Sequence, residues 1–150
     1  MAYVTQRPRP DKPVRLFLAC DLGARIDGAW WPYTATLSGE LAGLVAVLDG
    51  VLGKVIDVDV NWSPLHGPPN LNWRDWRSKP QHIITVGGRD AVANLLIVPC
   101  TTNGTLAGML LRRAANQAVA PRRGEEAMLA TAEEILRAAR RQRILGKVVD

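Results

Sequence analysis

The sequence predicts an α+β domain, in which a mainly antiparallel sheet of about four strands carries helices on one face and a long helix follows at the C-terminus. Three observations support this prediction. Apolar residues recur at helical spacing over residues 35–52, and the period changes to two in "KVIDVDVNW". Two apolar runs, "QHIITV" and "AVANLLIVP", then flank "GGRD", which is typical of a β-hairpin.

The first predicted elements are a strand and a helix. The run "VRLFLAC" at residues 14–20 is apolar enough for a strand with a buried face. The helix over residues 35–52 is expected to begin at a capping Thr34 and to end at Gly53. Its apolar side chains form one stripe, made of Leu37, Leu41, Leu44, Val45, Leu48 and Leu52.

The next strand, over residues 54–62, is predicted to be half-buried. One set of alternate residues is expected to face the core, namely Ile56, Val58, Val60 and Trp62. Asp57 and Asp59 are expected to face the other way. The second arm of the hairpin is apolar on both faces, so we expect it to lie centrally in the sheet.

Two helices complete the prediction. The first is expected to be capped by Thr102 or Asn103, and the second to run from about residue 125 to residue 145. The second has an apolar stripe of Met128, Ala132, Ile135 and Ala139.

The domain organisation follows from these elements. We expect a flexible basic arm at residues 1–13, the α+β domain at 14–120, and a C-terminal segment at 121–150 that packs on the domain or on a partner. A symmetric homodimer is the simplest partner for the stripe of the last helix.

Composition narrows the class of protein. The 150 residues suffice for one domain with its own core. The two cysteines, Cys20 and Cys100, form neither a CxxC pair nor a zinc-ligand spacing with histidine. No segment has the length of a signal peptide or a membrane span. The expectation is a cytoplasmic protein with no membrane contact and no cofactor.

The net charge of +5 is concentrated at the two ends of the chain. Residues 1–15 carry +3 and residues 112–150 carry +4, whereas the residues between carry −2. Such basic extensions favour solubility, and they also allow weak contact with nucleic acid or another anionic ligand. Any such binding is expected to depend strongly on salt.

The stretch "IDGAWWP" at residues 26–32 is the first candidate for a ligand site, with Asp27, Trp30 and Trp31 as its residues. Neighbouring side chains of an extended segment point to opposite sides. One indole is therefore expected in the core and the other at a groove, where it offers a broad apolar face to a ligand. A purely structural role for both indoles is the alternative.

The second candidate is the proline-rich segment at residues 63–80, which is long for a loop of a compact domain. Aromatic and basic side chains alternate in "NLNWRDWRSKP", as suits stacking on an anionic aromatic ligand or on single-stranded nucleic acid. The residues proposed here are Trp62, His66, Trp73, Trp76 and Arg77. The same indoles could instead attach the loop to the domain.

An enzyme at the same cleft is the alternative function. It requires an acid, a base and a nucleophile to converge from Asp27, Asp57, Asp59, His66 and Cys100. No catalytic motif joins these residues in the sequence, so the catalytic residues stay unknown. Asp57 and Asp59 lack a third ligand at a diagnostic spacing, and no metal is expected.

The sequence resembles an uncharacterised family of small actinobacterial proteins, a domain of unknown function. The resemblance covers about residues 14–115 and is carried by "DGAWWP", "LAGLVAVL", "KVIDVDVNW" and "LLIVP", of which "DGAWWP" is the most specific. Membership implies an intracellular bacterial protein and supplies no reaction or cofactor.

The sequence thus predicts a non-enzymatic binding or regulatory module with a tryptophan-lined cleft. The alternatives are a small enzyme that uses Asp, His and Cys groups, and a homo-oligomeric interaction subunit.

Overall fold

The computed structural model describes residues 13–34, 36–60 and 82–149. Its elements are β1 (Leu16–Leu18), β2 (Gly28–Trp30), α1 (Leu37–Leu52), β3 (Val55–Val60), β4 (Ile83–Gly88), β5 (Val92–Ile97), α2 (Gly104–Ala114) and α3 (Glu126–Val149). The basic arm expected at 1–13 lies outside the described residues except for Pro13, and the loop expected at 63–80 lies outside them entirely.

The fold is α+β, as predicted, but the sheet has five strands in the order β1-β2-β5-β4-β3 and is mixed. Strand β2 pairs parallel to β5, and the other neighbours pair antiparallel. The prediction of about four mainly antiparallel strands therefore missed β2. This strand has only three residues, too few to show a period of two, and its parallel pairing with β5 depends on the tertiary structure.

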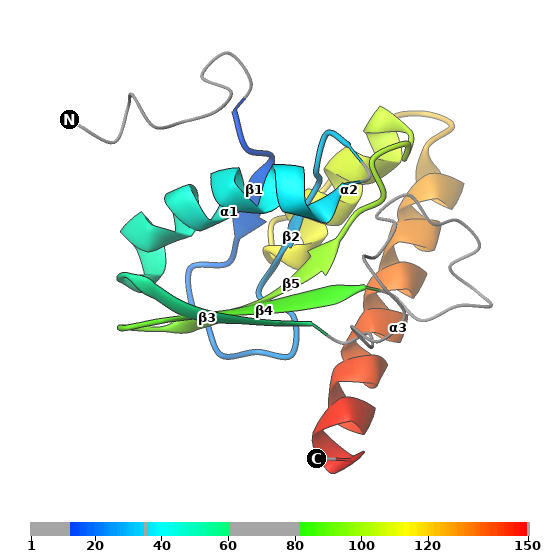
Figure 1. Cartoon of the computed structure of the whole chain (residues 1–150). Coiled ribbons are helices and arrows are strands. Elements are labelled where there is room, and N and C mark those ends of the chain that lie inside the picture. Colours follow the sequence, from blue (N-terminus) through cyan, green and yellow to red (C-terminus); the bar gives the residue numbers. More distant parts are fainter. Residues whose placement is uncertain (1–12, 35, 61–81, 150) are drawn as a thin grey trace.

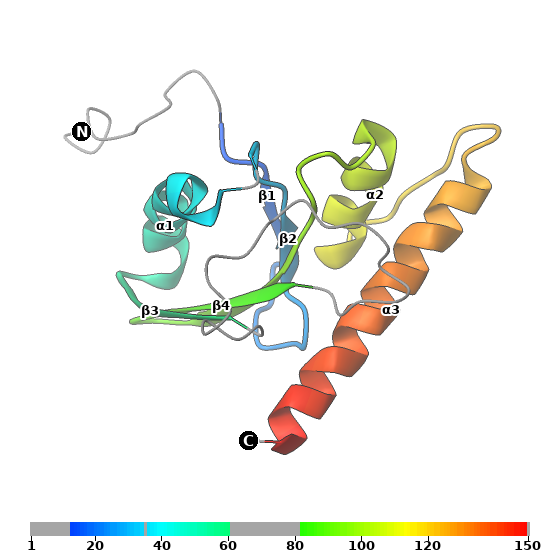
Figure 2. The same cartoon turned by 45° about the vertical axis from the view of Figure 1, so that its right-hand side comes forward.

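Helices cover both faces of the sheet, not one face as the sequence suggested (Figure 1). On one face α1 contributes Leu44, Leu48 and Leu52 to a core with Ile84 and Leu95. On the other face α2 and α3 form a second core, and in the turned view α1 and α3 lie on opposite sides of the strands (Figure 2). The cause is β5, which lies centrally as predicted and points Leu95 to one core and Leu96 to the other.

The predicted end of α1 at Gly53 is confirmed, whereas the predicted cap at its start, Thr34, is wrong. Gly53 adopts φ 74° immediately after the helix, as expected of a glycine that ends a helix. Thr34 does not cap the first turn, because the helix begins at Leu37. Instead, the carboxylate of Glu40 accepts hydrogen bonds from the backbone N–H groups of Tyr33 and Thr34 and from the Thr34 hydroxyl, and so shapes the approach to the helix.

Strand β3 departs from the strict alternation that the sequence suggested. The pairing of β3 with β4 shifts register between Val55 and Asp57. Val55, Val58 and Val60 pack against the α1 core, whereas Ile56 is 69 % exposed and not in the core as predicted. The irregularity inserts one residue into the strand, so the alternation of side chains restarts after it.

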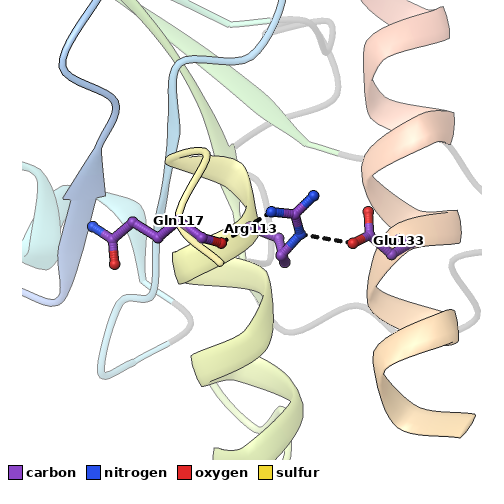
Figure 3. A network of polar contacts seen from close by, with 3 residues as sticks. All are labelled: Arg113, Gln117 and Glu133. Atoms are coloured by element: carbon purple, nitrogen blue, oxygen red, sulfur yellow. Dashed lines mark hydrogen bonds and ion pairs between the residues drawn. The ribbon is translucent and has the colours of Figure 1, made fainter. Parts of the chain in front are cut away.

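The C-terminal helix packs on α2 of its own chain. The predicted stripe residues Ala132, Ile135 and Ala139 are buried in the α2 core. Arg113 of α2 donates from Nε to the carboxylate of Glu133 of α3 at 2.7 Å, and from Nη1 to the carbonyl of Gln117 (Figure 3). The stripe therefore needs no second copy to cover it, which removes the reason for expecting a homodimer through α3.

No helix in the described part of the chain is long and apolar enough to cross a membrane.

Candidate functional site

Strands β2 and β5 form a topological switch point of the sheet. They are adjacent and parallel, and the chain leaves β2 for α1 on one face and leaves β5 for α2 on the other. In open sheets of this kind, ligands bind outside the carboxyl ends of the strands at the switch point. The residue before β1 and the residue before β4 reach the same edge, because both strands run antiparallel to their neighbours. We call Arg15, Trp31, Tyr33, His82 and Cys100 the switch-point edge.

The two neighbouring tryptophans lie on opposite faces of the sheet, as expected for an extended segment. Trp30 is 2 % exposed and packs in the α1 core, so it presents no surface to a ligand. Trp31 is partly buried against the α2 core. The structure therefore leaves only Trp31 of the pair at a position where a ligand could meet it.

Arg15 lies between two aromatic rings at the switch-point edge. Its guanidinium carbon is 3.7 Å from the ring centroid of Trp31 and 3.8 Å from that of Tyr33. Its Nε donates to the Trp31 carbonyl at 2.9 Å, and its Nη2 donates to the Pro32 carbonyl at 2.8 Å. This arrangement holds the planar guanidinium by stacking and by hydrogen bonds at once.

The electrostatic setting of Arg15 is that of a partly desolvated cation. Burial lowers the pKa of Arg15, while Tyr33, Glu40 and Cys100 act in the opposite direction. The group stays protonated at neutral pH, because the arginine pKa is far above 7. The switch-point edge thus carries a fixed positive charge beside two aromatic rings.

Two hydrogen-bond donors at this edge have no acceptor among the residues that the structure describes. Nε1 of Trp31 is shielded from solvent and lacks a hydrogen-bond partner. Nη1 of Arg15 makes no hydrogen bond with any of the described residues, since its guanidinium bonds come from Nε and Nη2. A buried donor without an acceptor, such as Nε1 of Trp31, is uncommon in folded proteins and costs about 1–3 kcal/mol.

Cys100 and the start of α2 form the other side of the switch point. Cys100 is a partly exposed free thiol in the connection between β5 and α2. Asn103 caps α2, as predicted, because its side-chain oxygen accepts from the N–H groups of Thr105 and Leu106. Cys20, which is also free, is exposed beyond the end of β1 and so lies at the opposite edge of the sheet.

His82 precedes β4, and its backbone carbonyl accepts from the N–H of Ile97. Burial lowers the pKa of the His82 imidazole to about 4, so this side chain is neutral at pH 7.

The pKa of His82 leads to a prediction about pH and stability. Between pH 6.5 and about 4 the unfolded chain takes up a proton at this position and the folded chain does not. The free energy of unfolding should therefore fall as the pH falls through this range. Because His82 is partly exposed, we expect a loss of about 1–2 kcal/mol rather than the full value of the shift.

Urea unfolding of the protein and of His82→Gln at several pH values measures this loss. The variant should show a flatter profile between pH 6.5 and 4, and His66 is present in both proteins, so its contribution cancels. Parallel profiles for the two proteins would show that His82 titrates normally.

Asp27 proves to be a structural residue. It is fully buried, and its carboxylate accepts from the backbone N–H groups of Gly23, Ala24 and Asn94. Asn94 in turn accepts from the hydroxyl of Thr85 and donates to the Ala24 carbonyl. These bonds join the β1–β2 connection to the middle of β5, and they leave Asp27 no surface for a ligand.

Asp57 and Asp59 do not reach the switch-point edge. Both are exposed on the edge strand β3, and the Asp57 carboxylate lies over Gly87 of β4. Within the residues that the structure describes, no three His, Cys, Asp or Glu side chains are grouped so that they could hold a metal ion. The structure thus places Asp27 in the core and Asp57 and Asp59 on β3, away from Cys100, and His66, the remaining residue of the enzyme alternative, lies outside the described residues.

The remaining predicted site residues lie outside the described residues, namely Trp62, His66, Trp73, Trp76 and Arg77. The segment that contains them joins β3 to β4. Its described neighbours on either side, Val60 and His82, lie at the same edge of the sheet as the switch point.

Sequence reasoning missed Arg15 and Tyr33. A signal for Arg15 was present, because it is the only charged residue in the strand-like run "VRLFLAC". Phe17, two residues later, packs in the α2 core, so the alternation of a strand places Arg15 on that same face, with Trp31. A charged side chain on a buried face requires hydrogen-bond or charge partners, so the position of Arg15 in the run indicated a polar site there.

Fold and site together define a sheet with helices on both faces and a switch-point edge that carries an arginine and aromatic rings. The chain belongs to a family of unknown function, DUF5994, whose model matches residues 15–114. The match extends from Arg15 to the end of α2, so it includes the switch-point edge and leaves α3 outside. No curated protein and no solved structure matches the chain.

Proposed function

We propose that the protein is a non-enzymatic binding module whose ligand site is the switch-point edge. The observation that carries this proposal is the position of the stacked Arg15 beside Trp31, at the point where α1 and α2 leave the sheet on opposite faces. Two rings and two hydrogen bonds already hold the Arg15 side chain in one conformation. Little conformational entropy would therefore be lost when a ligand binds to it.

The positions of the remaining polar groups favour binding over catalysis. Asp27 already accepts three backbone hydrogen bonds in the core, and Asp57 and Asp59 lie on β3, at the far side of the sheet from β2. The His82 imidazole is half-buried and neutral at pH 7. Cys100 is a free thiol, and no described carboxylate or imidazole forms a hydrogen bond with it that could activate it as a nucleophile. Among the five residues of the switch-point edge, the charged group is the guanidinium of Arg15, which binds and orients but does not exchange protons.

The two cysteines allow a test with an internal control. A ligand at the switch-point edge should slow the reaction of Cys100 with N-ethylmaleimide, because it covers the partly exposed thiol. Cys20 lies at the opposite edge and should react at an unchanged rate. Peptide mass mapping of the full-length protein, with and without the small-molecule filtrate of a bacterial lysate, measures both rates.

Native mass spectrometry of the same samples should show a bound species of low mass. The variant Cys100→Leu should weaken that binding by steric crowding, whereas Cys20→Leu should leave it unchanged. Equal protection of both thiols, or no bound species and no protection at all, would contradict the proposed function.

A further inference from the structure

We propose that the switch-point edge binds an oxyanion, a carboxylate or a phosphate group of the ligand, through Nη1 of Arg15 and Nε1 of Trp31. This inference rests on the proposed function and specifies the chemistry of the ligand. It starts from two donors of the same edge that the described residues do not satisfy.

The orientation of Arg15 commits two of its five N–H donors and leaves the two on Nη1 without an acceptor among the described residues. Nε and Nη2 point to the carbonyls of Trp31 and Pro32, and both faces of the guanidinium are covered by rings. A ligand that approaches in the plane of the guanidinium from the side of Nη1 therefore meets N–H groups that the described residues leave without an acceptor. In-plane approach to two N–H groups is the geometry in which guanidinium binds carboxylate and phosphate oxygens.

Charge favours an anion at this position. Among the described residues, no carboxylate forms an ion pair with Arg15. The nearest acidic side chain that influences it, Glu40, is already bonded to the Tyr33 and Thr34 backbone and to the Thr34 hydroxyl. A partly desolvated cation of this kind gains more from an anion than a fully hydrated one does.

Trp31 supplies the second donor. Its ring centroid lies 3.7 Å from the guanidinium carbon of Arg15, so its indole is an immediate neighbour of the cation that attracts the anion. Nε1 is shielded from solvent, and an acceptor reaches it only when the neighbouring groups shift. Binding should therefore change the environment of the indole N–H and give that atom the acceptor it lacks.

The indole N–H signals in a 15N-resolved NMR spectrum test this inference. The five tryptophans give up to five such signals, and the spectrum of Trp31→Phe identifies that of Trp31. Titration with inorganic phosphate, and separately with acetate, should move the Trp31 signal downfield and saturate with a Kd on the order of 1–10 mM, as expected of small ligands. Sodium chloride at the same ionic strength should not produce this shift.

Matched variants separate the site from general charge effects. Arg15→Lys keeps the charge but loses the planar fork, and should weaken phosphate or acetate binding by about tenfold or more. Arg89→Gln removes an exposed arginine from the β4–β5 turn, at the opposite edge of the sheet, and should bind as the parent does. The other indole signals report whether each variant keeps the parent fold; should Arg15→Lys lose it, Tyr33→Leu, which removes one stacking ring, takes its place.

The possible results of these titrations lead to different conclusions. Saturation by phosphate alone or by acetate alone assigns the source of the oxyanion. A Trp31 signal that responds to chloride as it does to phosphate and acetate, or equal binding by a folded Arg15→Lys, overturns the inference. If a lysate ligand still protects Cys100 in that case, the proposed function stands with a neutral ligand; if protection is absent as well, both fail.

Discussion

Replacing Asp27 by alanine is expected to lower the free energy of unfolding by about 3–5 kcal/mol. The carboxylate is fully buried and accepts from three backbone N–H groups, at 3.0 Å from Gly23, 2.8 Å from Ala24 and 2.9 Å from Asn94. Alanine would leave these donors without an acceptor, and the bond to Asn94 is itself buried. Hydrogen bonds to a charged acceptor are stronger than those between neutral groups, which raises the loss further.

Two variants sharpen this prediction. Asp27→Asn keeps one acceptor oxygen, but its amide NH2 group would face a backbone N–H group that now donates to Asp27. We expect this variant to lower the free energy of unfolding by about 2 kcal/mol, less than Asp27→Ala does. Asp21→Ala changes an exposed aspartate of the same β1–β2 connection and should stay within about 0.5 kcal/mol of the parent. Urea unfolding measures all three. A loss for Asp27→Ala no larger than that for Asp21→Ala would mean that the buried network contributes little.

Replacing Trp30 by alanine is expected to cost about 3–5 kcal/mol, because it opens a large cavity in the α1 core. Trp30 is among the largest fully buried side chains, and it packs in one cluster with Leu44, Leu48 and Leu95. Phenylalanine fills part of the same volume, so Trp30→Phe should lose less than Trp30→Ala.

The neighbouring residue provides the matched control. Trp31 is only partly buried, and phenylalanine keeps a ring for Arg15 to stack on, so Trp31→Phe should cost no more than about 1 kcal/mol. The two phenylalanine variants therefore differ in stability although they lie side by side in the chain. If Trp31→Phe were the more damaging of the two, the assignment of Trp30 to the core and Trp31 to the edge would have to be reversed.

The sequence was sufficient for elements whose side chains repeat over several turns or alternations. The stripe of Leu44, Leu48 and Leu52 predicted α1, and Gly53 predicted its end. Thr102 or Asn103 predicted the start of α2, which Asn103 caps in the structure, and the stripe that includes Ala132 and Ile135 predicted α3. In each case the signal is local, because helical spacing and capping depend on residues within a few positions of one another.

The candidate site was only partly visible in the sequence. The pair Trp30 and Trp31 pointed to the right segment, and alternation correctly separated the two indoles, although it could not say which one enters the core. Asp27 was included as a residue of the same stretch, "IDGAWWP". The structure instead has it bonded to Asn94, 67 residues away, through a contact that no local pattern contains.

What the sequence alone determined is the type of most elements and the central place of β5, because local periodicity and apolar content encode them. Only the tertiary structure decided that Gly28–Trp30 is a strand parallel to β5, that helices cover both faces of the sheet, and that Arg15 meets Trp31 and Tyr33. The physical reason is the range of the interactions. A three-residue strand and a stacked arginine acquire their partners from distant segments, so their free energy depends on the assembled sheet and not on neighbouring residues.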